Sequence, residues 1–248
     1  MKGLADRTAL VTGGSRGLGA EVVRHLARHG ADVAFTYQRS QDAAAALRDE
    51  IESTGRRCAA IAADVASFAT AECVVDQVLR DFESLHFLVC NAGFARSRPL
   101  AKMTEDDWDS VVDVCLKGAF NYIRAAAPHL VSQTFGRVVC IGSINGLRGR
   151  IGTASYNAAK AGLVGLVKTA AAELGQHSIN VNLVAPGFIE TPSQSETPEI
   201  VRDLVLKECA IKRLGRPEDV APVVAFLCSD DAHHLTGQVL KVDAGQYL

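Results

Sequence analysis

A glycine-rich turn lies between a short apolar strand and a helical pattern. It limits the folds that this chain can adopt more than any other segment. The apolar run 8–12 leads into Gly13-Gly14-Ser15-Arg16-Gly17-Leu18-Gly19, and apolar residues at helical spacing follow as far as Gly30. In this order of elements, glycines let the backbone approach a pyrophosphate that sits on a helix N-terminus. The spacing differs from the more frequent G-x-G-x-x-G, and a plain tight turn is the alternative that the rest of the chain must exclude.

Apolar strands and helical patterns alternate along the whole chain. Further strands are predicted at residues 32–37, 57–65, 86–90, 137–142, 179–185 and 238–243. Helical patterns are predicted at residues 41–54, 69–82, 104–130, 153–174, 199–210 and 217–228. This alternation predicts an α/β fold with a doubly wound, Rossmann-type parallel sheet of about seven strands and helices on both faces. Because no linker or repeat interrupts it, we expect residues 1–248 to form a single domain.

Composition argues for a soluble protein without a nucleic-acid or membrane partner. Hydrophobic residues make up 48% of the chain and charged residues 22%, which is ordinary for a globular domain. A net charge of -2 and the lack of a basic cluster give no electrostatic case for nucleic acid. No apolar run approaches the roughly 20 residues of a membrane span, and the start of the chain lacks a signal-peptide core. We therefore expect a cytoplasmic protein.

The cysteines and histidines do not predict a disulfide framework or a metal site. The seven cysteines contain no Cys-x-x-Cys pair, and most lie within apolar stretches, so we interpret them as reduced packing residues. His25 and His29 are four residues apart in a helical pattern but have no evident third ligand. We interpret them as residues of the helix surface, and His233-His234 as part of a turn.

Three polar residues in the segment 143–160 form a candidate catalytic group. Ser143 follows the apolar run 137–142, so its hydroxyl lies at a strand's carboxyl end, where open α/β sheets bind ligands. Tyr156 and Lys160 are four apart at the start of an alanine-rich helical pattern, where they share a face and the ammonium favours the phenolate. Each residue alone is more often a packing or solvated residue. Their combination with the glycine turn is informative.

The end of the second strand favours NADPH over NADH. An NAD-selective fold has an acidic residue there that binds the ribose 2′-hydroxyl, but this chain reads Thr36-Tyr37-Gln38-Arg39-Ser40. Arg39 and Arg16 could clamp a 2′-phosphate by charge-assisted hydrogen bonds, with Ser40 adding another. Two solvated arginines are the alternative. Asp64, at the end of the third strand, could accept a hydrogen bond from an adenine amino group.

Taken in order, these residues resemble a short-chain dehydrogenase/reductase over essentially the whole chain. The matching pieces are Thr12-Gly13-x-x-x-Gly17-x-Gly19, Asp64-Val65, Asn91-Ala92-Gly93, Ser143, Tyr156-x-x-x-Lys160 and Pro186-Gly187. Within the family, the stretches 184–191 and 213–220 most resemble the β-ketoacyl thioester reductases of fatty-acid and polyketide synthesis. The resemblance implies NADPH-dependent reduction of a 3-oxoacyl thioester, carried by acyl carrier protein or CoA. A reductase of a free ketone or secondary alcohol, or a non-catalytic NADP-binding protein, is the alternative.

The resemblance also implies a role for each matching residue. Tyr156 would give its proton to the carbonyl oxygen as the nicotinamide delivers hydride to carbon, and Ser143 would hold that oxygen. Lys160 would bind the ribose hydroxyls and stabilise the phenolate. The other residues expected to contact NADP(H) are Gly13, Ser15, Arg16, Gly17, Leu18, Gly19, Arg39, Ser40, Asp64, Val65, Asn91, Ala92, Gly93, Pro186, Gly187, Ile189 and Thr191.

Two positions depart from the family pattern. Cys115 stands where the family usually has an asparagine, whose backbone carbonyl holds a water that links Lys160 to solvent. Cysteine keeps that carbonyl, so we expect the proton relay to survive with a less well anchored helix distortion. The basic residues that dock the carrier in well-known relatives correspond here to Thr134 and His177. Other candidates for a docking patch are Arg124, Arg148, Arg150 and Lys168.

The sequence also predicts a substrate lid and an oligomer. The polar, proline-marked segment 191–198 predicts a substrate lid near residues 188–210, with an ordinary surface loop as the alternative. Relatives in the family are commonly tetramers built through the two long helices around the fifth strand and through the last strand. We therefore expect a homotetramer.

Overall fold

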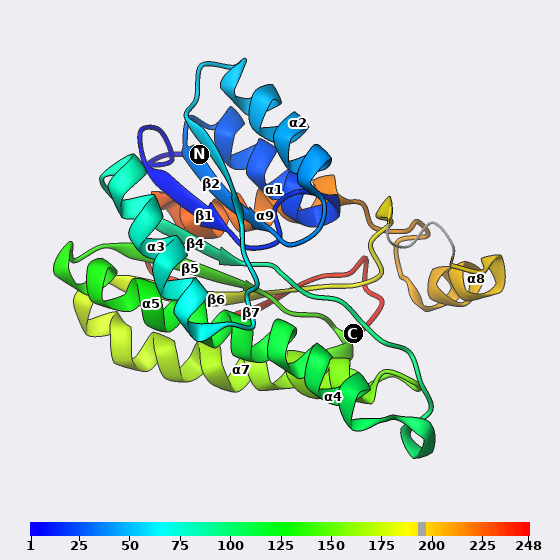
Figure 1. Ribbon diagram of the computed structural model, residues 1–248. Helices are drawn as coiled ribbons and strands as arrows, with labels where there is room; N and C mark the ends of the chain where they lie inside the picture. The colour runs from blue at the N-terminus through cyan, green and yellow to red at the C-terminus, as the bar shows by residue number, and fades with distance from the viewer. Residues whose placement is uncertain (193–196) are drawn as a thin grey trace.

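A single parallel sheet forms the centre of the molecule, whose computed structural model describes residues 1–192 and 197–248 (Figure 1). Its strand order is β3-β2-β1-β4-β5-β6-β7, and every neighbouring pair is parallel. The strands are β1 (Thr8–Val11), β2 (Asp32–Tyr37), β3 (Cys58–Ala62), β4 (Phe87–Cys90), β5 (Gly136–Ile141), β6 (Ile179–Pro186) and β7 (Val239–Val242). The predicted α/β fold with a doubly wound sheet is confirmed.

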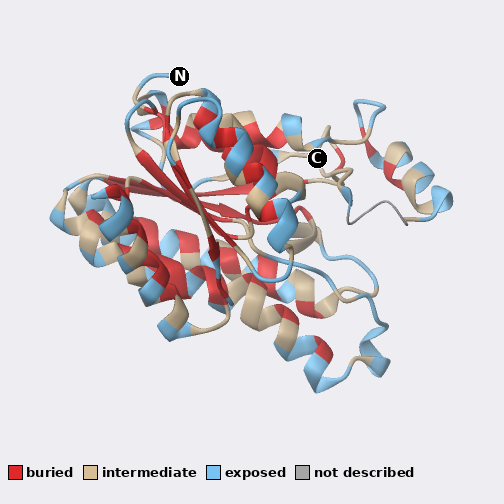
Figure 2. Cartoon of the chain, turned by 45° about the horizontal axis from the view of Figure 1, so that its top comes forward, coloured by how far each residue is buried: buried red, intermediate tan, exposed pale blue. Residues whose placement is uncertain are grey.

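Helices cover both faces of the sheet and enclose a core on each side (Figure 2). The helices are α1 (Gly17–Arg28), α2 (Gln41–Glu52), α3 (Phe68–Phe82), α4 (Glu105–Val112), α5 (Gly118–Ser132), α6 (Asn145–Arg148), α7 (Ala154–Leu174), α8 (Glu199–Glu208) and α9 (Pro217–Cys228). Apolar residues of α1, α2 and α9 form one core, and those of α3, α5 and α7 form the other. Strands buried on both faces read as continuous apolar runs, which is why the sequence pattern located them.

The order of the strands places a ligand crevice between β1 and β4. The chain winds outward from β1 to β3, returns to β4 on the other side of β1, and then continues to β7. At such a switch point the loops after the two central strands diverge, and open α/β sheets bind ligands at the carboxyl ends there. The glycine turn follows β1, and Asn91 follows β4, so both lie at this edge.

The helix predicted over residues 104–130 is interrupted. Thr104 caps α4 in a capping box with Asp107, as its sequence suggested, but a π-helical segment, Asp113–Lys117, separates α4 from α5. A π-turn inserts one extra residue into a helix and is frequent at functional sites, and its centre here is Cys115. Periodicity alone does not reveal such an insertion, because the apolar pattern resumes after it.

The structure describes only part of the predicted substrate lid. The predicted lid includes residues 193–196, which lie outside the described residues, so the lid stays a prediction. Its later part forms α8.

Within the described chain, none of the helices is long and apolar enough to cross a membrane.

Most of the cysteines are buried, as their apolar sequence context suggested, and His25 and His29 are half-buried. Six cysteines are buried and Cys73 is exposed, and all seven are free thiols. Burial raises the pKa of Cys58 to about 12, which keeps its thiol protonated. The rings of His25 and His29 lie 4.7 Å apart on α1, and the described residues contain no group of three or more His, Cys, Asp or Glu that could hold a metal.

Candidate active site

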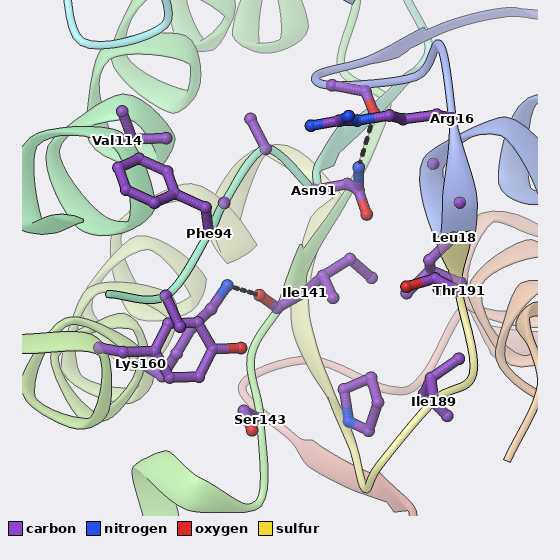
Figure 3. Close-up of a pocket in the computed structure, with 18 of the residues that line it drawn as sticks. Arg16, Leu18, Asn91, Phe94, Val114, Ile141, Ser143, Lys160, Ile189 and Thr191 are labelled. Carbon is purple, nitrogen blue, oxygen red and sulfur yellow. Dashed lines mark hydrogen bonds between the residues drawn. The ribbon is translucent and has the colours of Figure 1, made fainter. Parts of the chain in front are cut away.

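A cavity of about 1090 Å³ opens at the carboxyl edge of the sheet and joins the two motifs of the sequence (Figure 3). The glycine turn lines one end, and Ser143, Tyr156 and Lys160 line the other. Every residue predicted to contact the cofactor also lines this cavity. Cys115 does not line it, and lies behind Gly93 instead. The structure therefore brings the predicted site residues together, while their individual roles stay predictions.

The backbone of the glycine turn favours glycine, as Gly13 and Gly19 illustrate. Gly13 has a φ of +65°, in the left-handed region that side chains disfavour. A Cβ on Gly19 would lie 2.2 Å from the Gly13 carbonyl oxygen and 2.5 Å from Nδ2 of Asn91. Glycine at position 19 thus lets the first turn of α1 approach the Gly13 carbonyl, and both glycines line the cavity, where a pyrophosphate could approach the backbone closely.

Thr12 and Asn91 tie this turn to the end of β4. The hydroxyl of Thr12 accepts hydrogen bonds from the backbone N–H groups of Asn91, at 2.9 Å, and Ala92, at 3.1 Å. Asn91 Nδ2 donates to the carbonyl oxygens of Thr12, at 2.9 Å, and Gly13, at 3.0 Å. Thr36, which had no predicted role, accepts from the Gly13 N–H at 3.1 Å. These bonds fix the two loops of the switch point relative to each other.

Two exposed arginines stand at the glycine-turn end of the cavity. Arg16 is the N-cap residue of α1, and Arg39 follows β2. Among the described residues neither guanidinium has an ion-pair partner, so both are available to an anionic ligand. Asp64, also exposed, uses one carboxylate oxygen to accept the Ala66 N–H at 3.0 Å. Asp64 also lines the cavity.

Ser143, Tyr156 and Lys160 come from the end of β5 and the first turns of α7. Lys160 is 3% exposed, and its Nζ donates to the Ile141 carbonyl oxygen at 2.5 Å and lies 5.6 Å from the centroid of the Tyr156 ring (Figure 3). Ser143 is buried, and its Oγ accepts the Asn145 N–H at 3.2 Å, so its own proton is free to point at a ligand. A substrate carbonyl oxygen bound here would lie near the Ser143 hydroxyl and the Tyr156 phenol, with the Lys160 ammonium close to the phenol ring.

Two buried cysteines, Cys90 and Cys140, lie side by side near the ends of β4 and β5, where they are direct neighbours in the register of the two strands. Their hydrogen bond and complete burial raise the pKa of Cys90 well above its ordinary value. Both therefore act as packing residues below Lys160.

Cys115 anchors the π-helical segment to the loop that follows β4. It is 2% exposed, and its Sγ donates to the Phe94 carbonyl oxygen at 3.4 Å. A Cβ added to Gly93 would lie 3.2 Å from this sulfur and 3.4 Å from Lys160 Nζ, so the thiol and the ammonium flank the same glycine. The helix distortion expected at this position is present as the π-helical segment, and the Cys115 thiol ties it to the Phe94 carbonyl oxygen.

Sequence reasoning missed some residues of the cavity wall. Gln246, near the C-terminus, lines the cavity, accepts the Phe188 N–H at 3.0 Å and donates to Glu208 at 2.9 Å. Asn145 lines it beside Ser143. No motif marks either residue, because each reaches the cavity through a tertiary contact rather than through the spacing of an element.

Comparisons with known proteins show the family of this chain. A family model described as enoyl-(acyl carrier protein) reductase matches residues 13–246. A 3-oxoacyl-(acyl-carrier-protein) reductase of Staphylococcus epidermidis is 41% identical, over 98% of this chain and 100% of its own length. The chain belongs to the short-chain dehydrogenase/reductase family. As a member of it, the protein is an oxidoreductase that acts on a ketone or an alcohol.

Two solved structures also match this chain over nearly its full length. One is a short chain dehydrogenase from Burkholderia cenocepacia J2315 in complex with NADP, 37% identical, with a TM-score of 0.93 and 98% of both chains covered. The other is a blue fluorescent protein from a metagenomic library in complex with NADPH, 37% identical, with a TM-score of 0.92 and 99% of both chains covered. The resemblance inferred from the motifs is confirmed over nearly the full chain.

Proposed function

We propose that this protein reduces a 3-oxoacyl thioester, carried by acyl carrier protein or CoA, to the 3-hydroxyacyl thioester with NADPH. The observation that carries the proposal is the convergence of Ser143, Tyr156 and Lys160 with the glycine turn in one cavity. The relative from Staphylococcus epidermidis, named for the same reaction, supports the choice of substrate.

NADP(H) is the cofactor, and the residues present fit it. The bare backbone at Gly13 and Gly19 suits the pyrophosphate, and the cavity continues from there to Lys160. Two related structures hold NADP or NADPH. When bound, the cofactor supplies a hydride to the carbonyl carbon. Arg16 and Arg39 would select its phosphorylated form, because a 2′-phosphate offers them charge-assisted hydrogen bonds that a 2′-hydroxyl lacks.

Protein side chains supply the proton. In this proposal Ser143 donates a hydrogen bond to the carbonyl oxygen, and Tyr156 transfers its hydroxyl proton to that oxygen as the carbon is reduced. The Lys160 ammonium stabilises the phenolate that remains, until a proton from solvent restores the phenol. The 3-hydroxyacyl product thus gains one hydride and one proton.

We also propose that the protein works as a homotetramer in the cytoplasm. Trp108 on α4 and Phe120 on α5 are 41% and 44% exposed, which is unusual for such large apolar side chains in an isolated chain. On α7, Ala161, Gly165 and Ala172 are exposed at helical spacing and leave room for a close approach by a second helix.

The proposed reaction is tested by the initial rate of NADPH oxidation with three substrates. These are a 3-oxoacyl-CoA, the same acyl group on acyl carrier protein, and a simple cyclic ketone. We expect kcat/KM to be highest with the thioesters. A cyclic ketone that outcompetes both would favour a reductase of free ketones, and tight NADPH binding without turnover of any substrate would favour a non-catalytic role.

A further inference from the structure

Arg150 and Ile151 lie side by side in the loop between α6 and α7, and both line the cavity. Ile151 is 99% exposed, the highest value among the large apolar side chains of the described residues. Arg150 is also exposed. A cation next to an apolar side chain therefore stands on the substrate side of the cavity, six residues before Tyr156.

The main chain of this loop is fixed although its two side chains are free. Gly152 accepts the Arg98 N–H at 2.7 Å, which joins the loop to the segment after β4. The carbonyl oxygen of Arg150 accepts from Asn157 Nδ2 at 2.9 Å and from the Thr153 hydroxyl at 3.2 Å. The backbone of the loop is thus held in place without a ligand, while the two side chains stay free to contact one.

The neighbouring arginines form ion pairs, whereas Arg150 forms none among the described residues. Arg148 pairs with Glu208 at 2.8 Å, and Arg98 pairs with Asp107 at 2.6 Å. In the described part of the chain no carboxylate forms an ion pair with the Arg150 side chain, whose charge acts on Glu208 only at longer range.

The other basic residues considered for carrier docking do not compete for the cavity. Arg124 on α5 pairs with Glu72, and Lys168 is exposed in the middle of α7; neither lines the cavity. Of the four candidates for carrier docking, Arg150 is therefore the one that lines the cavity.

We propose that Arg150 and Ile151 form a subsite for a phosphopantetheine arm. Arg150 binds the phosphate, and Ile151 packs against the gem-dimethyl carbon that adjoins it in this arm. The Arg150 carbonyl oxygen lies 2.9 Å from Asn157 Nδ2 in the first turn of α7, so the loop folds back and the subsite lies close to Tyr156 in the same cavity. The inference rests on the proposed function, since CoA and acyl carrier protein share this arm.

Calorimetry with the NADP⁺-loaded protein tests the subsite without turnover. The probes are 4′-phosphopantetheine and pantetheine, which differ only in the phosphate. We expect the phosphate to strengthen binding about tenfold in the wild type, as a charge-assisted contact does, and Arg150→Gln to abolish that difference. Ile151→Ala should weaken both probes equally. Arg80→Gln, the same charge change at an exposed residue outside the cavity lining, should behave as the wild type.

Equal affinity for the two probes in the wild type, or a phosphate effect that persists in Arg150→Gln, would overturn the subsite. Turnover measurements distinguish an arm carried by CoA from one carried by acyl carrier protein. A matching fall in kcat/KM for the CoA and carrier thioesters in Arg150→Gln supports phosphate recognition. A fall with the carrier substrate alone would assign Arg150 to the carrier's protein surface and overturn it. A wild type that discriminates the probes but reduces no thioester would refute the proposed function alone.

Discussion

At the scale of a single residue, we propose that Arg39 decides the choice between NADPH and NADH. Its guanidinium lies in the cavity wall, exposed, at the place where an NAD-selective fold carries an acid. A hydrogen bond to a charged group contributes about 1.5 to 3 kcal/mol, so one arginine is enough to set a preference of tenfold or more.

Replacing Arg39 should change the preference between the two cofactors. We expect Arg39→Gln to lower kcat/KM for NADPH about tenfold and to leave that for NADH within about twofold, because only NADPH loses a charge-assisted hydrogen bond. Steady-state rates with each cofactor measure this, with Arg80→Gln as the charge-matched control. An equal loss with both cofactors would mean that Arg39 acts on the fold instead of on the 2′-phosphate.

Single residues of the site differ in how far sequence could predict them. The convergence of Ser143, Tyr156 and Lys160 was predictable, because a strand end and a four-residue helical spacing fix their directions. The need for glycine at position 19 was also predictable, and the 2.2 Å approach of a Cβ to the Gly13 carbonyl explains it. Gln246 was not predictable, since its place depends on how the C-terminal segment folds back onto Phe188.

Among the elements, the π-helical segment Asp113–Lys117 bears most on the site. Sequence patterning located strands and helices to within a few residues, because both faces of the sheet are buried and each helix has an apolar stripe. It predicted one helix where there are two, since one inserted residue leaves the apolar pattern on both sides intact. The family resemblance alone indicated a distortion near Cys115.

Cys115 should support the reaction through its backbone rather than its thiol. The sulfur is outside the cavity lining and hydrogen bonds to the Phe94 carbonyl oxygen. We expect Cys115→Asn to change kcat by less than about tenfold, or about 1.4 kcal/mol in the barrier. Single-turnover rates at saturating NADPH measure this. A hundredfold increase would show that the cysteine leaves the proton relay severely impaired.

At the scale of the whole molecule, stability should depend on a histidine at the amino end of the sheet. Burial, followed by the charges of Arg7 and His129, lowers the pKa of His86. The neutral ring accepts the Thr8 N–H at 3.0 Å through Nδ1, which joins β1 to the segment before β4. Because the folded pKa is below the unfolded value of about 6.5, this contribution is present above that pH and is lost as pH falls.

We therefore expect the free energy of unfolding to fall between about pH 7.5 and 5.5, in part through His86. Urea denaturation at several pH values measures the slope. His86→Gln removes the titrating group, so its stability should fall less steeply than that of the wild type. Parallel curves for the two proteins would show that protonation of His86 does not contribute.

The proposed tetramer makes a prediction at Gly165 of α7. A side chain added there meets nothing within 4 Å in the isolated chain, so Gly165→Arg should leave the protomer folded. We expect light scattering at micromolar concentration to give four copies of the 26.3 kDa chain for the wild type and a smaller assembly for the variant. A monomeric wild type would rule the tetramer out.

The central claim is that Tyr156 protonates a carbonyl that NADPH reduces, and one comparison tests it most directly. The measurement is the rate of NADPH oxidation with a 3-oxoacyl-CoA by the wild type and by Tyr156→Phe, alongside NADPH binding followed by fluorescence. Loss of a general acid typically costs 10²- to 10⁴-fold, so we predict a fall in kcat of at least about a hundredfold with NADPH affinity within about threefold. A variant that keeps more than about a tenth of the wild-type rate would contradict the account.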